Sequence, residues 1–79
     1  MRAVKVEFGS VGTQWAVLDK VVERNGRQRA RLKKYSMSGN WWTQWRWYEA
    51  SIIAVSRPFT RDIPAVVAEE VRRCAKEAA

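Results

Sequence analysis

Four basic residues occupy every second position of one short stretch of the chain. They are Arg27, Arg29, Arg31 and Lys33. In a β-strand, successive side chains point to opposite faces, so these four cations would line one face of a sheet. Like charges this close destabilise a sheet, so the pattern favours a partner with a row of negative charges. A nucleic-acid backbone is such a partner, because contacts from Lys and Arg to phosphates supply much of its binding affinity.

Aromatic residues follow this stretch closely. The segment GNWWTQWRWYEASII, residues 39–53, contains four of the five tryptophans of the chain. Flat rings can stack on unpaired bases, at about 1–3 kcal/mol for each base. Trp, Tyr and Arg are also the residues enriched at hot spots between proteins. A large aromatic side chain can equally fill the core of a small domain, so the indoles must be sorted by face.

Composition limits the classes of function. The 79 residues predict a single domain, 1–79, and the net charge of +7 favours an acidic partner. The chain has no histidine and only scattered carboxylates, and no glycine-rich loop to cradle phosphates, so we expect that it is not an enzyme. Cys74 is the single cysteine, which excludes an intrachain disulfide. We expect no cofactor and no metal.

The ends of the chain and its apolar runs bear on location. The N-terminal segment MRAVKVEF alternates polar and apolar residues and lacks the apolar core of a signal peptide. The longest aliphatic run, IIAV, is far too short to span a bilayer. We therefore expect a cytoplasmic protein without a membrane partner.

Alternation and turn signals predict an α+β fold, with an antiparallel meander over residues 1–56 and a helix over 61–78. Strands are expected at residues 4–8, 13–24, 27–36 and 41–49, and residues 50–55 either extend the last strand or form a fifth. Asn25-Gly26 is the strongest hairpin signal, because a type I′ turn needs positive φ at both positions. The alternative fold is a small SH3-like or OB-like barrel with the helix appended.

The C-terminal segment shows helical periodicity. Asp62 is the expected N-cap, and Pro64 is expected in the first turn, where its missing N–H does little harm. Glu69 and Arg73 can pair across one turn. Cys74 is interpreted as a small apolar core residue. The apolar stripe of this helix consists of Ile63, Val66, Val67, Val71, Cys74, Ala75 and Ala78.

Two assumed turns sort the sheet residues into two faces. A two-residue loop at Asn25-Gly26 and a four-residue loop at residues 37–40 place Leu32 opposite both Asp19 and Trp45. The predicted core face, on which the helix can pack, carries Trp15, Val17, Val21, Ala30, Leu32, Trp45 and Trp47. The predicted basic face carries the candidate binding residues, namely Arg27, Arg29, Arg31, Lys33, Tyr35, Trp42, Gln44, Arg46 and Tyr48.

These features predict a nucleic-acid-binding module that prefers single strands. An antiparallel sheet that presents cations and aromatics is a recurring solution for unpaired nucleic acid. The order of strands and helix resembles that of the dimeric transcriptional coactivators that bind single-stranded DNA, which implies that the chain could form a homodimer. The alternative is an inhibitor or adaptor that binds an acidic protein surface with the same face. In size and composition, the chain resembles the compact proteins with which phages block host nucleic-acid-processing or CRISPR complexes.

Overall fold

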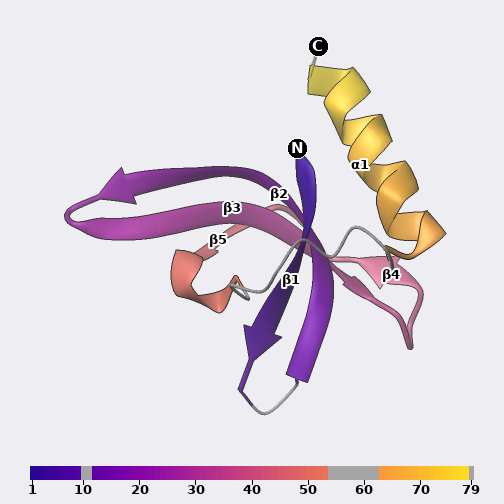
Figure 1. The fold of residues 1–79 in the computed structure, drawn as a ribbon, viewed down its shortest axis with the longest axis horizontal. Helices are drawn as coiled ribbons and strands as arrows, with labels where there is room; N and C mark the ends of the chain where they lie inside the picture. Colours follow the sequence, from indigo (N-terminus) through magenta and orange to yellow (C-terminus); the bar gives the residue numbers. More distant parts are fainter. Residues whose placement is uncertain (10–11, 54–62, 79) are drawn as a thin grey trace.

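The computed structural model describes residues 1–9, 12–53 and 63–78, and it confirms the predicted α+β fold (Figure 1). An open, five-stranded antiparallel sheet is followed by one C-terminal helix. The strands are β1 Arg2–Phe8, β2 Gly12–Arg24, β3 Arg27–Ser36, β4 Trp41–Trp42 and β5 Arg46–Glu49. A 3-10 helix, η1 Ala50–Ile52, follows β5, and the α-helix is α1 Ala65–Ala78. The spatial order is β1-β2-β3, with β4 and β5 both pairing with β3.

The hairpin between β2 and β3 forms as the sequence predicts. Asn25 and Gly26 have φ values of 55° and 76°, the positive angles that a type I′ turn requires. The register that follows, with Val21 opposite Ala30, is also confirmed. Figure 1 shows this long hairpin projecting away from the helix, and β5 pairs with β3 as far as Arg29.

A β-bulge at Asp19 shifts the rest of this register. Beyond it, Leu18 pairs with Leu32, and Val17 pairs with Lys33. The predicted pairing of Asp19 with Leu32 is therefore wrong by one residue. A one-residue shift moves side chains to the opposite face, so Val17 shares a face with Lys33 and Leu18 shares one with Leu32.

A second irregularity lies between β4 and β5. Tyr35 pairs with Trp42 as predicted, but Leu32 then pairs with Arg46 and not with Trp45. The intervening Thr43 uses both of its polar groups on one residue of β3: its N–H donates to the Lys34 carbonyl and its hydroxyl accepts from the Lys34 N–H, each at 2.8 Å. The one extra residue reverses the predicted face of every residue of β5.

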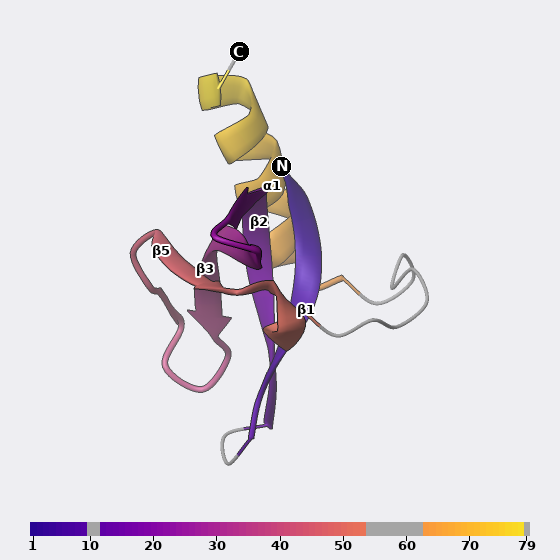
Figure 2. The ribbon, with the colours of Figure 1, turned by 90° about the vertical axis from the view of Figure 1, so that its left-hand side faces the viewer.

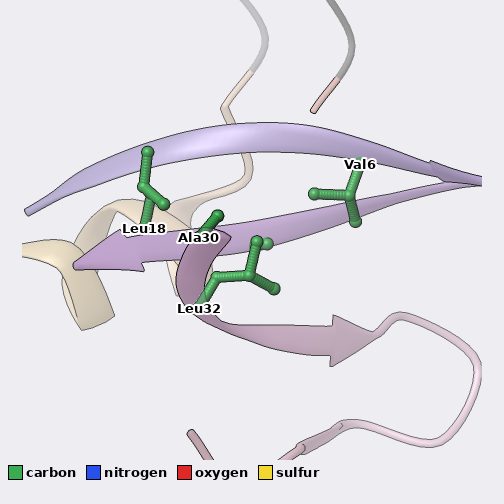
Figure 3. Packing of buried hydrophobic residues seen from close by; sticks show 5 residues of the cluster. Val6, Leu18, Ala30 and Leu32 are labelled. Carbon is green, nitrogen blue, oxygen red and sulfur yellow. The ribbon is translucent and has the colours of Figure 1, made fainter. Parts of the chain in front are cut away.

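The buried core lies on one face of the sheet and contains small and aliphatic side chains (Figure 3). Tyr48 packs against it, with its ring edge-on to Phe8 at 5.8 Å, although we predicted Tyr48 on the basic face. The chain then folds over the same core through η1, and Ile53 bridges back to Val6 of β1. The core cluster consists of Val6, Ala16, Leu18, Ala30 and Leu32.

The helix covers the other face, which corrects the predicted packing. Val67 of α1 and Val17 of β2 are completely buried, and Cys74 is nearly so, as predicted. Figure 2 shows α1 behind β1 and β2, while η1 lies in front of them. Lys33, which we placed on the basic face, lies on this helix-covered side and pairs with Glu70.

The helix begins later than predicted. Its first residue is Ala65, and the carbonyl of Pro64 accepts the N–H groups of Val67 and Ala68, so Pro64 stands just before the first turn. The proposed N-cap, Asp62, lies outside the described residues. Ala75, assigned to the apolar stripe, is exposed. Within the described part of the chain, no helix is long and apolar enough to cross a membrane.

The revised faces give a direct test of stability. Leu32 is fully buried, whereas Trp47 is 43% exposed. Leu32→Ala should therefore lower the free energy of unfolding by about 3 kcal/mol, whereas Trp47→Ala should lower it by about 1 kcal/mol or less. Urea denaturation followed by circular dichroism measures both, with the exposed Trp41→Ala as control. A Trp47→Ala variant as unstable as Leu32→Ala would contradict this core.

Candidate functional site

Three tryptophans lie on the same side of the sheet as the basic residues of β3. Trp47 pairs with Arg31, so the two side chains share a face. The Arg31 guanidinium carbon lies 4.6 Å from the centre of the Trp45 ring. The Lys33 ammonium lies 5.1 Å from Trp45 and 5.4 Å from Trp42. We call Trp42, Trp45 and Trp47 the indole row, which lies beside Arg31 and Lys33 of β3.

This arrangement differs from the predicted one. Trp45 and Trp47 were expected in the core, and the structure places both against cations on the opposite face. A cation over an aromatic ring contributes about 0.5–1 kcal/mol when exposed and about 2 kcal/mol when desolvated. Arg31 and Lys33 therefore help to hold the rings in place on a face where one of them stays accessible.

Each residue of the basic stripe of β3, which consists of Arg27, Arg29, Arg31 and Lys33, has a carboxylate partner. Arg29 donates from Nη1 to Glu49 Oε1 at 2.8 Å, and Arg27 approaches the same oxygen at 3.6 Å. Arg31 donates from Nη1 to Asp19 Oδ2 at 2.8 Å. These pairs relieve the repulsion that four close cations would cause. They also show that the stripe is not a row of bare charges.

Lys33 is paired in a different way, because it is buried. Only 7% of the residue is exposed, and its ammonium donates to Glu70 Oε1 on α1. Arg73 donates to both Glu70 oxygens, and the Cys74 thiol lies 3.6 Å from Oε1. Hydrogen bonds from Arg73, and then from Lys33, outweigh burial and hold the pKa of Glu70 at about 2. Burial raises the pKa of Cys74.

The remaining predicted site residues divide between the two faces. Tyr35 is buried next to Trp42, with ring centres 4.8 Å apart, and its hydroxyl donates to Asn40 Oδ1 at 3.2 Å. Gln44 is exposed in the segment between β4 and β5. Arg46 is exposed but pairs with Leu32, so it lies on the side of β5 away from Trp47. Arg46 and Tyr48 are thus separated from the basic face on which we predicted them.

Each indole of the row borders a hollow that also contains cations. The hollow at Trp47, about 290 Å³, is lined by Val22, Arg24 and Arg29. A second, about 230 Å³, lies at Trp45, and a third, about 540 Å³, lies between Trp42 and α1. The cations of the second are Arg31, Lys33 and Arg73, and those of the third are Arg72, Arg73 and Lys76.

Sequence reasoning missed several of these lining residues. Arg24, which was not predicted, faces the same hollow as the predicted Arg29, because the Val22–Arg29 pair and the Arg24–Arg27 pair are neighbours along the hairpin. Arg73 was expected to pair with Glu69 and binds Glu70 and Glu77. Trp41 is 54% exposed, and its ring lies so close to Gly39 that a larger residue there would overlap it.

Comparison of the chain with family models, curated proteins and solved structures finds no significant match. The site is therefore interpreted from its own geometry. An exposed indole can stack on a flat ring. Oriented guanidinium groups beside it can donate hydrogen bonds to acceptor groups on that ring. The charge around both is positive.

The Glu70 contacts predict how stability depends on pH. The pKa of Glu70 falls from 4.5 to about 2 on folding, so its contribution is complete above pH 4.5 and is lost as the pH falls towards 2. Glu70→Gln should lower stability at neutral pH by about 2 kcal/mol and should flatten this acid dependence.

Thermal melts between neutral and acidic pH measure the effect. Glu69→Gln, an exposed position one residue away on α1, is the matched control and should follow the unmodified chain. Parallel acid profiles for Glu70→Gln and the unmodified chain would show that the ion pair does not hold the helix.

Proposed function

We propose that this chain is a non-enzymatic nucleic-acid-binding module that prefers single strands, with the indole row as its binding surface. One observation carries the proposal: the three indoles lie beside the cations of β3 and not in the core. Trp47 in particular is 43% exposed, at a hollow lined by two arginines. Such a ring is a platform for one unpaired base.

The form of the row favours a single strand. In a duplex, the faces of the bases are stacked on one another, so an indole can reach them only where the strand is unpaired. Trp47 is five positions after Trp42 in the chain, a span of at most roughly 18 Å for an extended chain. This length suits a short single-stranded site of about four nucleotides, near the lower end for small sheet-based binders.

Phosphate contacts are available at both ends of the row. Arg24 and Arg27 are exposed on the hairpin, and Arg72 and Lys76 are exposed on α1 near Trp42. The pair of Arg27 with Glu49 is long, at 3.6 Å, and the Arg27 side chain is 76% exposed. Surface ion pairs contribute only about 0–1 kcal/mol, so a phosphate can replace the carboxylate.

A protein partner is the second candidate, and the compensated charges favour it. Arg29 and Arg31 each hold a carboxylate, so the centre of the face can meet a partner without phosphates. Val22, which pairs with Arg29, and the exposed Trp47 supply apolar surface on this face. In this function, the chain would be an inhibitor or adaptor that uses Trp47 as an anchor.

Removing the exposed hairpin cations tests the nucleic-acid function. The double variant Arg24→Gln/Arg27→Gln should bind a short labelled single strand about tenfold more weakly, with a salt slope lower by about 1.4. Fluorescence anisotropy at several salt concentrations measures both quantities. Arg46→Gln, an exposed cation on the other side of β5, is the matched control and should change little. Unchanged affinity of the double variant, or equal affinity for a duplex, would contradict the proposal.

Nuclease treatment separates the two candidates. If a protein is the partner, a complex of fixed stoichiometry should survive nuclease and should be lost in Trp47→Ala, because the anchor is removed. If nucleic acid is the partner, captured proteins should disappear after nuclease treatment. Size-exclusion chromatography with light scattering, before and after treatment, gives the composition of the complex.

A further inference from the structure

We propose that the hollow at Trp47 receives an unpaired guanine base. This inference rests on the proposed function and names the base that its most exposed position would recognise. The hollow is lined by one apolar residue, Val22, one aromatic residue, Trp47, and two arginines, Arg24 and Arg29. A site for phosphate alone would not require the indole or the valine.

Arg29 is held in place more firmly than a typical surface arginine. It pairs with Val22 on one side and with Glu49 on the other, so its backbone lies between two strands. Its Nη1 donates to Glu49 Oε1 at 2.8 Å, and only 35% of the side chain is exposed. A guanidinium has five N–H donors in a rigid fork, so an anchored group still has donors for a ligand.

The chemistry of the bases favours guanine at such a fork. A base stacked on Trp47 would meet paired N–H donors at its edge, and guanine offers two adjacent acceptors, N7 and O6. Adenine places its N6 amino donor beside N7, which opposes a donor on the protein. Cytosine offers O2 and N3, but its single ring covers less of the indole. Thymine and uracil have an N–H between their two carbonyls.

The other residues of the hollow have separate roles. Arg24 is exposed at the rim, where it can contact the phosphate next to the bound base. Glu49 is a positioning residue: it orients Arg29 and does not itself line the hollow. Its negative charge also weakens contacts to phosphate nearby, so Glu49 lowers general affinity while it supports the choice of base.

A series of otherwise identical strands tests the inference on the unmodified protein. Thymine strands with one central guanine, adenine or cytosine, and uracil strands with the same substitutions, distinguish DNA from RNA as the source of the base. A single guanine should raise the affinity roughly tenfold over adenine or thymine, with cytosine intermediate. Affinity is measured by fluorescence anisotropy of the labelled strands.

Two variants and a control test whether the guanidinium fork of Arg29 causes the preference for guanine. Arg29→Lys keeps the charge but removes the fork, so it should bind the four strands alike. Arg46→Lys, at an exposed arginine on the other side of β5, is the matched control and should keep the guanine preference. Glu49→Ala should reduce the preference while it raises the affinity for the all-thymine strand.

The outcomes separate this inference from the proposed function. Equal binding of all four strands, with the expected dependence on salt, would overturn the guanine site and leave the binding function standing. Cytosine bound as tightly as guanine, or a preference retained in Arg29→Lys, would overturn it as well. No measurable binding of any strand would overturn both proposals. Circular dichroism melts confirm that each variant is folded, and the strand series on the unmodified chain needs no variant.

Discussion

The ion pair between Lys33 and Glu70 determines how the helix meets the sheet. Lys33 lies near the middle of a sheet face and is 7% exposed, and a buried ammonium without a partner would be strongly unfavourable. Its carboxylate comes from α1, so the helix must dock on this face, where Val67 and Val17 are buried together. The sheet thus has the helix on one face and the chain after β5 on the other.

This division explains why the indoles lie outside the core. One face is closed by Tyr48, by η1 and by the bridge from Ile53 to Val6. The other face is occupied by α1 around Lys33, with Trp42 and Trp45 at the edge of that contact. The large rings therefore complete the border of the helix contact, and Trp47 continues the row onto the projecting hairpin, where it stays partly exposed.

The fold was predictable from the sequence because its elements depend on local signals. The site depends on two single-residue shifts in strand pairing, which are harder to predict. The alternation of β3, the turn at Asn25-Gly26 and the periodicity of the C-terminal helix are each encoded within a few residues. All three elements form, although the helix begins at Ala65 and Ala75 of its predicted stripe is exposed. Asp19 forms a bulge and pairs with Arg31 across the hairpin, which no local pattern reveals. The extra residue after Trp42 had one visible signal, the polar Thr43-Gln44 inside the aromatic run. Because faces alternate, the bulge reversed the part of β2 that precedes Asp19, and the extra residue reversed the whole of β5.

The carboxylates that pair with the basic residues of β3 change how the positive charge of this face acts on a ligand. A carboxylate beside an arginine cancels its field at long range but fixes the direction of its remaining donors. The exposed cations Arg24, Arg72 and Lys76 border the two outer hollows of the row, and the oriented, paired Arg31 lies between them. An anion would thus be attracted mainly at the ends of the row. In the proposed function, the rings and the carboxylate-paired Arg29 and Arg31 offer flat surfaces and fixed donors, which would suit a base better than a phosphate.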